Sequence, residues 1–300
     1  MPLITVIGSS NTDMVVKAAR FPAPGESIIG GEFFMFSGGK GANQAVAAAR
    51  MGGQVTFIGR TGKDIFGERA ISELKKEGID TSHISTDHET ASGVALILVN
   101  SEGENEIVVA PGSNSTLQPS EIDAAKDALI KSEIILLQLE IHLNAVIHAI
   151  EQAHALGKKV ILNPAPAQSI PHSLYPLLHL ITPNETEAEI LTGIIVRDKA
   201  SASMAAEALL ARGVRNVIIT LGSKGVYYKS KESEMEVAAP KVHAVDTTAA
   251  GDVFNGVLAV ELASGKDWKE AMETACRAAS HSVTRMGAQP SMPYRHELAE

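Results

Sequence analysis

Two aspartates bracket five small residues near the C-terminal end of the chain, in the sequence DTTAAGD at 246–252. An apolar stretch typical of a helix, VFNGVLAVELA, follows at once. Asp is a common helix N-cap, but the small residues also leave bare backbone N–H groups where a helix N-terminus attracts an anion. Gly251 permits close approach, and Asp252 could accept the proton of an attacking alcohol. We therefore expect an anion hole for a transferring phosphoryl group, formed by the amides of Ala249, Ala250, Gly251 and Asp252.

A second set of polar residues could bind the hydroxyls of a sugar. Asn11 and Asp13 follow the first apolar stretch at alternate positions, a spacing that suits two adjacent hydroxyls. The sequence SGGKGANQ at 37–44 places three glycines before an Ala-rich helix and adds Lys40 and Asn43. Taken singly, these are ordinary turn residues. Together they predict a crevice that binds a polyol.

Two Gly-Lys pairs suggest a nucleotide-binding P-loop, but neither fits the motif. Phe34 stands where a glycine should precede the pair at 39–40, and Phe57 and Asp64 occupy required positions around the pair at 62–63. The first apolar stretch is followed by GSSNTD, not by G-x-G-x-x-G. The sequence therefore excludes a Walker A loop and a dinucleotide fingerprint.

The elements that must position these residues alternate regularly along the chain. Short apolar runs are predicted strands at 3–8, 55–59, 133–137, 159–162, 179–182 and 216–220. Amphipathic or Ala-rich stretches between them predict helices near 40–51, 64–77, 119–131, 143–156, 184–192 and 199–212, with two successive helices in 249–285. Such alternation indicates an α/β, Rossmann-like fold in which helices sandwich a mostly parallel sheet.

The stretches 14–36 and 91–110 interrupt this rhythm and read as paired strands joined by Gly/Pro or Glu-Gly turns. We expect them to form a small β-rich lid or a dimer surface, inserted in a single domain of residues 1–300. Ligands of an open α/β sheet bind beyond the carboxyl ends of the strands. The polar residues that follow the predicted strands should therefore surround one crevice.

The composition narrows the possible partners. A formal net charge of −9 argues against nucleic acid or an anionic membrane as the main partner. Cys276 is the only cysteine, which excludes intrachain disulfides and favours a reducing compartment. The start MPLITVIGSS has no basic or long apolar region, and no apolar run reaches the length of a membrane span. We expect a cytoplasmic protein.

These motifs together resemble the PfkB family of carbohydrate kinases, and within it the ribokinases. The likeness runs from the first strand to within ten residues of the C-terminus, in the family's order. It rests on GSSNTD (8–13), SGGKGANQAVAAARMGG (37–53), NPAP (163–166), TPNETE (182–187), TLGSKGV (220–226), DTTAAGD (246–252) and RMGAQPSMP (285–293). The resemblance implies ATP-dependent phosphorylation of D-ribose at O5.

The resemblance also implies roles for matching residues. Asp252 corresponds to the base that takes the proton of the 5-hydroxyl, beside an anion hole at 249–252. The sugar site corresponds to Asn11, Asp13, Gly39, Lys40, Asn43, Glu140 and Asp252. ATP contacts correspond to Asn184, Thr220, Gly222, Ser223, Gly225 and Gly251, with Cys276 where relatives carry Asn or His near the adenine. By itself Cys276 reads as a small buried residue, and Asn184 as a helix N-cap.

Two cations and a partner are implied in the same way. Asn184 and Glu187 match the family's N-x-x-E motif, which is linked to Mg²⁺ and here implies that Glu187 binds it through water. A site for K⁺, formed mostly by backbone carbonyls, corresponds to Asp246, Thr248, Ser282, Arg285, Gly287 and Ser291. The β-rich lid resembles one that covers the sugar and pairs with its twin in a homodimer.

Relatives often carry glycine where Ala249 stands, so we expect a negative φ at this position. Three alternatives to a ribose kinase remain open from the sequence. The first is another sugar or nucleoside kinase of the same family, such as a deoxyribokinase, a fructokinase or an adenosine kinase. The second is a catalytically silent sugar sensor. The third is a glycosidase that uses Asp246 and Asp252 as its carboxylate pair, which the low aromatic content of 4% disfavours.

Overall fold

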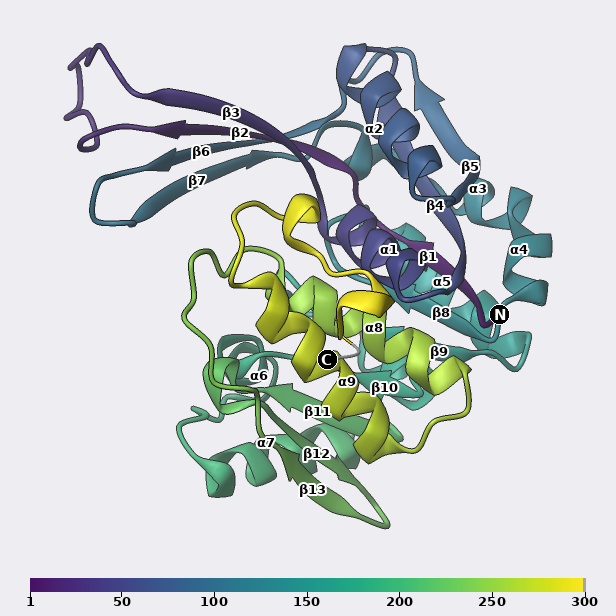
Figure 1. Cartoon of the computed structure of the whole chain (residues 1–300). Coiled ribbons are helices and arrows are strands. Elements are labelled where there is room, and N and C mark those ends of the chain that lie inside the picture. Colours follow the sequence, from purple (N-terminus) through teal and green to yellow (C-terminus); the bar gives the residue numbers. More distant parts are fainter. Residues whose placement is uncertain (299–300) are drawn as a thin grey trace.

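The computed structural model describes residues 1–298 and shows a large sheet between two layers of helices, with a smaller sheet projecting from one side (Figure 1). The large sheet has nine strands in the order β13-β12-β11-β10-β9-β8-β1-β4-β5. These strands are β1 (Leu3–Ile7), β4 (Gln54–Gly62), β5 (Asp80–Asp87), β8 (Ile134–Leu137), β9 (Lys159–Leu162), β10 (Leu180–Ile181), β11 (Asn216–Thr220), β12 (Val226–Ser230) and β13 (Glu234–Val237). All pair in parallel except β12 and β13, which form an antiparallel edge.

Helices bury the sheet on both faces, which explains why the central strands read as continuous apolar runs. One core contains Ile4 and Val6 of β1 together with α1 (Lys40–Arg50), α8 (Ala250–Ala263) and α9 (Trp268–Ser282). The opposite core contains Ile7 and the helices α3 (Pro119–Ala124), α4 (Lys126–Lys131), α5 (Leu143–Ala155), α6 (Glu185–Thr192) and α7 (Lys199–Ala211). The predicted α/β fold with helices on both faces is confirmed.

Several element boundaries differ from the prediction. The single helix expected at 119–131 is two short helices, α3 and α4, separated at Ala125. The strands β5, β12 and β13 were not predicted. The helix α2 (Ile65–Lys76) begins close to the predicted position, directly after its N-cap Asp64. Asp64 accepts hydrogen bonds from the amides of Phe66 and Gly67. Within residues 1–298, no helix combines the length and the apolar character needed to cross a membrane.

The smaller sheet, here called the lid, has the order β3-β2-β6-β7. It consists of β2 (Asn11–Lys17), β3 (Glu32–Gly38), β6 (Gly93–Val99) and β7 (Asn105–Ala110), and it projects at the upper left of Figure 1. These are the two stretches that interrupt the alternation in sequence. Only Gly8–Ser10 separate β1 from β2, so Asn11 and Asp13 lie on a strand of the lid rather than in a loop after β1.

Candidate active site

The glycine-rich loop packs against the connection between β1 and β2. The amide of Ala42 donates to the carbonyl of Ser9 over 2.9 Å. A Cβ at Gly41 would lie 2.6 Å from the backbone of Gly8, and one at Gly39, where φ is +88°, would lie 2.7 Å from the amide nitrogen of Asn11. These two glycines therefore allow close approach to the protein's own backbone, which brings the start of α1 against the start of the lid.

Asp252 lies in the first turn of α8 and is buried, with 6% of its surface exposed. The side-chain amide of Asn43 donates to its Oδ2 over 3.0 Å, and that of Gln44 donates to its Oδ1 over 3.0 Å. Burial raises the pKa of the Asp252 carboxyl, while the charge of Lys40 and these two amides oppose the rise. The site holds a carboxylate that is desolvated yet hydrogen-bonded at both oxygens.

Lys40 stands among four carboxylates. Its burial favours the neutral amine, but the charges of Asp252, Glu140, Glu187 and Asp13 outweigh that effect and raise its pKa. Burial, followed by the charges of Glu140 and Asp252, raises the pKa of Asp13 to about 6. Within residues 1–298 the ammonium of Lys40 makes no hydrogen bond. The structure therefore gathers these predicted residues around one cation that remains free to bind an anionic group.

The remaining residues predicted for the sugar site are hydrogen-bonded within the chain. Glu140 accepts from the hydroxyl of Ser9 over 2.6 Å and from the amide of Lys40 over 3.0 Å. Asn114 donates to Oδ1 of Asn11 over 2.7 Å and also bonds the backbone of Ser10. Asn114 was missed in sequence because it lies 103 residues from Asn11 in a stretch without a recognisable motif. Its role is to orient Asn11.

The backbone at the start of α8 departs from the expectation of a negative φ. Ala249 has φ 61° and ψ 10°, the left-handed conformation, so that expectation was wrong. The left-handed conformation costs an L-residue about 1–2 kcal/mol. The surrounding structure must impose it, since the next residue already begins α8 and the carbonyl of Ala249 accepts from Val253 over 2.9 Å.

This strained turn exposes amides. The amide of Ala250 donates to the carbonyl of Thr247 over 3.3 Å, whereas those of Ala249, Gly251 and Asp252 have no backbone acceptor among the described residues. No atom within 4 Å occupies the space where a Cβ at Gly251 would lie. Three of the four predicted donors are therefore free, and the approach to them is open.

The residues predicted for ATP lie side by side at the ends of β10 and β11. Asn184 and Thr220 form an isolated parallel bridge, and Gly222 and Ser223 follow in an exposed 3₁₀ turn that ends at Gly225. Cys276 differs from this group. It is 4% exposed in the core, and burial raises the pKa of its thiol to about 12, which leaves little surface for a nucleotide.

Asn184 and Glu187 form the capping box of α6. The amide of Glu187 donates to the side chain of Asn184 over 2.8 Å, and Oε2 of Glu187 accepts from the amide of Asn184 over 2.9 Å. Oε1 of Glu187 makes no hydrogen bond within residues 1–298. One carboxylate oxygen near Lys40 and Asp252 is thus available to metal-bound water, which fits the implied Mg²⁺ contact.

The predicted K⁺ residues come from two neighbouring segments. Oδ1 of Asp246 accepts from the amide of Thr248 over 2.9 Å, and its Oδ2 accepts from the amide of Gly287 over 2.8 Å. Despite burial, these bonds lower the pKa of Asp246. Asp246 therefore stays ionised and ties the loop before α8 to Gly287, in the segment after α9. Ser282, the last residue of α9, and Ser291 are buried. Carboxylate and carbonyl oxygens are the ligands that hard cations prefer.

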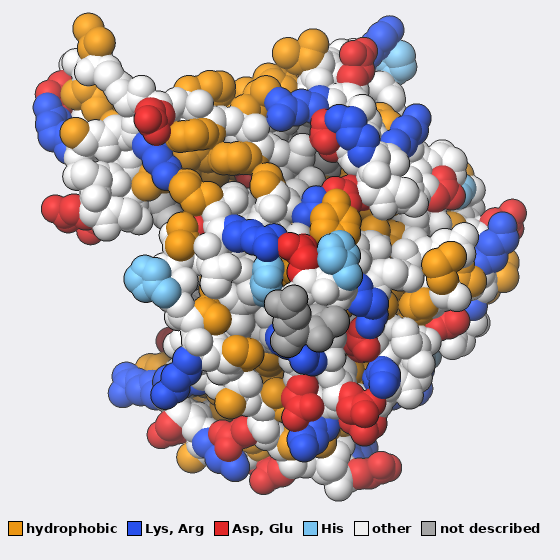
Figure 2. Space-filling view, in the orientation of Figure 1, with side chains coloured by type: hydrophobic (Ala, Val, Ile, Leu, Met, Phe, Trp, Pro, Cys, Tyr) orange, Lys and Arg blue, Asp and Glu red, His pale blue; other side chains and the backbone are white. Residues whose placement is uncertain are grey.

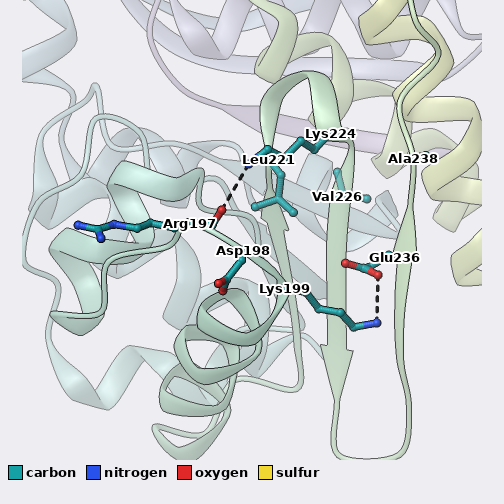
Figure 3. A pocket seen from close by; sticks show the side chains of 8 residues that line it. All are labelled: Arg197, Asp198, Lys199, Leu221, Lys224, Val226, Glu236 and Ala238. Carbon is teal, nitrogen blue, oxygen red and sulfur yellow. Dashed lines mark hydrogen bonds and ion pairs between the residues drawn. The ribbon is translucent and has the colours of Figure 1, made fainter.

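A cavity of about 260 Å³ lies against the same loop as Gly222 and Ser223. Figure 3 shows two contacts among the residues that line it: Lys199 pairs with Glu236 over 3.0 Å, and Lys224 donates to the backbone carbonyl of Arg197 over 3.4 Å. It contains none of the carboxylates around Lys40. We therefore assign the chemistry to the crevice at Asp252, not to this cavity.

Comparisons with known proteins show what the chain is similar to. The model of the pfkB family of carbohydrate kinases matches residues 1–295. A ribokinase from Haemophilus influenzae is 44% identical over 297 residues, covering 99% of this chain and 97% of that protein. A deoxyribokinase from Salmonella typhi is 40% identical, covering 99% and 97%. The solved structure of an Arabidopsis thaliana ribokinase complexed with ribose and ATP superposes with a TM-score of 0.94 at 32% identity, covering 99% and 97%.

Proposed function

The chain belongs to the PfkB family of carbohydrate kinases, and from this premise we propose that it transfers the γ-phosphoryl group of ATP to O5 of D-ribose. The observation that carries the proposal is the placement of Asp252. Its buried carboxylate adjoins free amides at the start of α8 and the polyol-binding residues around Lys40. The ribokinases among its relatives support ribose as the acceptor.

In this proposal Asp252 accepts the proton of the 5-hydroxyl as O5 bonds to the γ-phosphorus. The bond between the γ-phosphorus and the β–γ bridging oxygen breaks, and ADP leaves with that electron pair. Even with a raised pKa, Asp252 is a weak base for an alcohol. It therefore orients the hydroxyl first and takes the proton late, as in other phosphoryl transfers.

The chain's own donors stabilise the charge of the transferring group. The free amides of Ala249, Gly251 and Asp252 point from the start of a helix, where the dipole adds to their effect. The ammonium of Lys40 supplies a further positive charge. Asn11, Asp13, Asn43 and Glu140 would hold the sugar hydroxyls, and Asn184 and Thr220 with the following turn would hold the nucleotide.

We propose two cations in addition. Mg²⁺, when bound with ATP, neutralises phosphate charge, and Oε1 of Glu187 would accept from a water in its shell. Asp246 with carbonyls of Thr248, Ser282, Arg285, Gly287 and Ser291 would hold K⁺. Arg285 would contribute through its backbone, because its guanidinium pairs with Glu297 over 2.7 Å.

We also propose that the lid joins two copies of the chain. By register, Asp13 shares its face of the lid with Val15, Ile97 and Ile107, while the opposite face carries Val16, Phe33, Leu96 and Val108. Several of these side chains are exposed, and Figure 2 shows hydrophobic side chains along the projecting lid. Since the face that bears Asp13 serves the sugar, the opposite one suits a second copy.

The test is an acceptor panel with the purified chain and ATP. We expect the highest kcat/KM with D-ribose, against 2-deoxyribose, fructose and adenosine. A higher value for deoxyribose would favour the deoxyribokinase alternative, which the Salmonella typhi relative supports. Absence of ATP turnover with every acceptor would favour a sugar sensor. Equal rates in K⁺, Na⁺ and buffer without alkali cations would refute the K⁺ site.

The variant Asp252→Asn tests the base directly. We expect kcat to fall by roughly 10²–10⁴-fold, the usual contribution of a general base, while ATP affinity changes little. Asp127→Asn removes an exposed carboxylate on α4 and serves as the matched control with unchanged turnover. Near-normal turnover of Asp252→Asn would contradict the assignment.

A further inference from the structure

A chain of buried amides lies behind Asp252. Gln138 donates through Nε2 to Oε1 of Gln44 over 2.6 Å, and Gln44 donates through Nε2 to both Oδ1 of Asn163 and Oδ1 of Asp252, each over 3.0 Å. Gln44 and Gln138 are fully buried and Asn163 is 7% exposed. Neither Gln44 nor Gln138 belongs to the residues expected to touch sugar or nucleotide.

The direction of every bond in this chain follows from one backbone carbonyl. Nδ2 of Asn163 donates to the carbonyl of Thr182 over 3.1 Å, and a carbonyl can only accept. Oδ1 of Asn163 must therefore face Gln44, which turns Nε2 of Gln44 toward Asn163 and Asp252. Oε1 of Gln44 then faces Gln138, which donates to it. The amide of Gln44 can thus only donate to Asp252.

The position of Gln44 is equally constrained. A Cβ at Gly256 of α8 would lie 2.5 Å from the carbonyl oxygen of Gln44 and 2.8 Å from Cβ of Ala47, so α1 and α8 are in close contact at this level. Oε1 of Gln138, at the far end of the chain, has no partner within residues 1–298. The bond to Gln44 is therefore the contact that orients the Gln138 amide, and it holds Gln44 in turn.

We propose that Gln44 is a positioning residue that keeps Asp252 ionised and fixes the direction of its carboxylate. The proposal rests on the proposed role of Asp252 as the base. A hydrogen bond donated to a carboxylate favours its charged form, and this matters most where water is excluded. Asn43 holds Oδ2 from the side of the sugar residues, and Gln44 holds Oδ1 from the core. Without Gln44, Asp252 would keep its burial but lose half of its hydrogen bonds.

The variant Gln44→Met, which keeps length and volume but cannot donate, tests this. We expect kcat to fall about 10- to 100-fold, the range of a hydrogen bond to a charged group, with the KM values for ribose and ATP within about threefold. The acidic limb of the kcat–pH profile should move up by about one pH unit, because the carboxyl now protonates more easily. A profile that keeps its acidic limb in place would overturn the proposal.

A structural control separates this effect from a loss of stability. Thr5→Val removes a buried hydrogen bond of 2.7 Å between Thr5 and Ser132, away from the crevice. It should lower the melting temperature and leave the pH profile unchanged. If Gln44→Met does not fold, Gln138→Met replaces it, because it removes only the contact that orients Gln44. We expect a smaller shift of the limb in the same direction, and no shift would overturn the proposal.

The double variant Gln44→Met/Asp252→Asn distinguishes failure of this inference from failure of the proposed function. If Gln44 acts through the carboxylate, the double variant should turn over within about twofold of Asp252→Asn alone. A further large loss would contradict the inference. If instead Asp252→Asn retains normal turnover, the proposed function fails before Gln44 is in question.

Discussion

The crevice around Asp252 and the lid use opposite kinds of surface. In the crevice the carboxylates of Asp252, Glu140 and Glu187 accept hydrogen bonds from within the chain and surround the ammonium of Lys40. The lid exposes apolar side chains, among them Phe33, Leu96 and Val108. The crevice therefore takes its order from internal hydrogen bonds. In the proposed function the partners of the lid come from outside the chain, a sugar on one face and a second copy on the other.

The crevice, the lid and the start of α8 each lower the stability of the chain, but through different physical effects. In the crevice the cost is electrostatic, because burial and the charge of Glu140 raise the pKa of Asp13 and that of Asp252. In the lid the cost is exposed apolar area. At the start of α8 it is backbone strain, at Ala249 alone. Variants in these three places should therefore change different measured quantities.

Among the variants that test the comparison of crevice and lid, Asp13→Asn is expected to have the largest effect. The kcat/KM for ribose should fall about 10²-fold, because hydrogen bonds from sugar hydroxyls to a charged acceptor are lost. At pH 7.5 the free protein should nevertheless become more stable by on the order of 1 to 3 kcal/mol, since the pKa of Asp13 is raised to about 6 from an ordinary value near 3.9. Urea denaturation and ribose titration measure the two effects.

The raised pKa of Asp13 also makes the stability of the chain depend on pH. A folded-state pKa above the unfolded one means that the folded chain binds more protons, so the contribution of Asp13 to the free energy of unfolding rises as pH falls from about 6 toward 4. Asp13→Asn should remove this rise. Asp64→Asn is the control of opposite sign, because hydrogen bonds lower the pKa of Asp64 and its loss should destabilise. A destabilised Asp13→Asn at pH 7.5 would contradict the electrostatic account of the crevice.

An effect of similar size, on assembly alone, is expected in the lid. Val108→Asp places a charge in the proposed contact between copies, and Val108 is 68% exposed in the single chain. The dissociation constant of the dimer should rise at least about 10²-fold, because an unpaired charge is costly to bury. Sedimentation velocity measures it. Ile190→Asp, at 59% exposure on α6, should leave the oligomeric state unchanged. A wild-type chain that sediments as a monomer would refute the lid contact itself.

The smallest effect is expected for Ala249→Gly. Glycine adopts φ 61° without the penalty of a Cβ, but it gains more freedom in the unfolded chain. We expect a net gain of about 0.5–1 kcal/mol in the free energy of unfolding, and kcat within about threefold of the wild type. Ala250→Gly, one residue into α8, should destabilise by about 0.5–1 kcal/mol instead. Thermal denaturation that ranks the two variants in the reverse order would show that Ala249 is not strained.

Most of the fold could be predicted from the sequence because its buried strands are continuous apolar runs separated by amphipathic helices. The strand β5 was missed because DTSHISTD is polar and its side chains are mostly exposed or half-buried. The hairpin β12–β13 was missed because an edge hairpin interrupts the βαβ alternation. Local sequence patterns identify helices and strands that bury one or both faces. They predict a strand at the edge of a sheet poorly.

Site residues could be predicted from the sequence where the chemistry requires one residue type. Residues that act by hydrogen-bonding to another site residue were harder to predict. Asp252, Lys40 and Asp13 were predicted to share the crevice, and the structure brings them together. Gln44, Asn114 and Gln138 were not predicted as functional, because their contacts join segments about 100 residues apart. The conformation of Ala249 was predicted wrongly because tertiary contacts override a local preference for negative φ.

The short connection between β1 and β2 has a mechanical consequence. β2 carries Asn11 and Asp13 near its first residue, and its last residue, Lys17, lies ~20 Å further along an extended chain of seven residues. Counted from Ser10, Asp13 lies about 10 Å along the strand and Lys17 about 23 Å. A small rotation about Gly8–Ser10 therefore displaces Lys17 about twice as far as Asp13, and further still than Asn11. In this respect β2 is a lever, and a movement at the proposed sugar site would be amplified toward the tip of the lid.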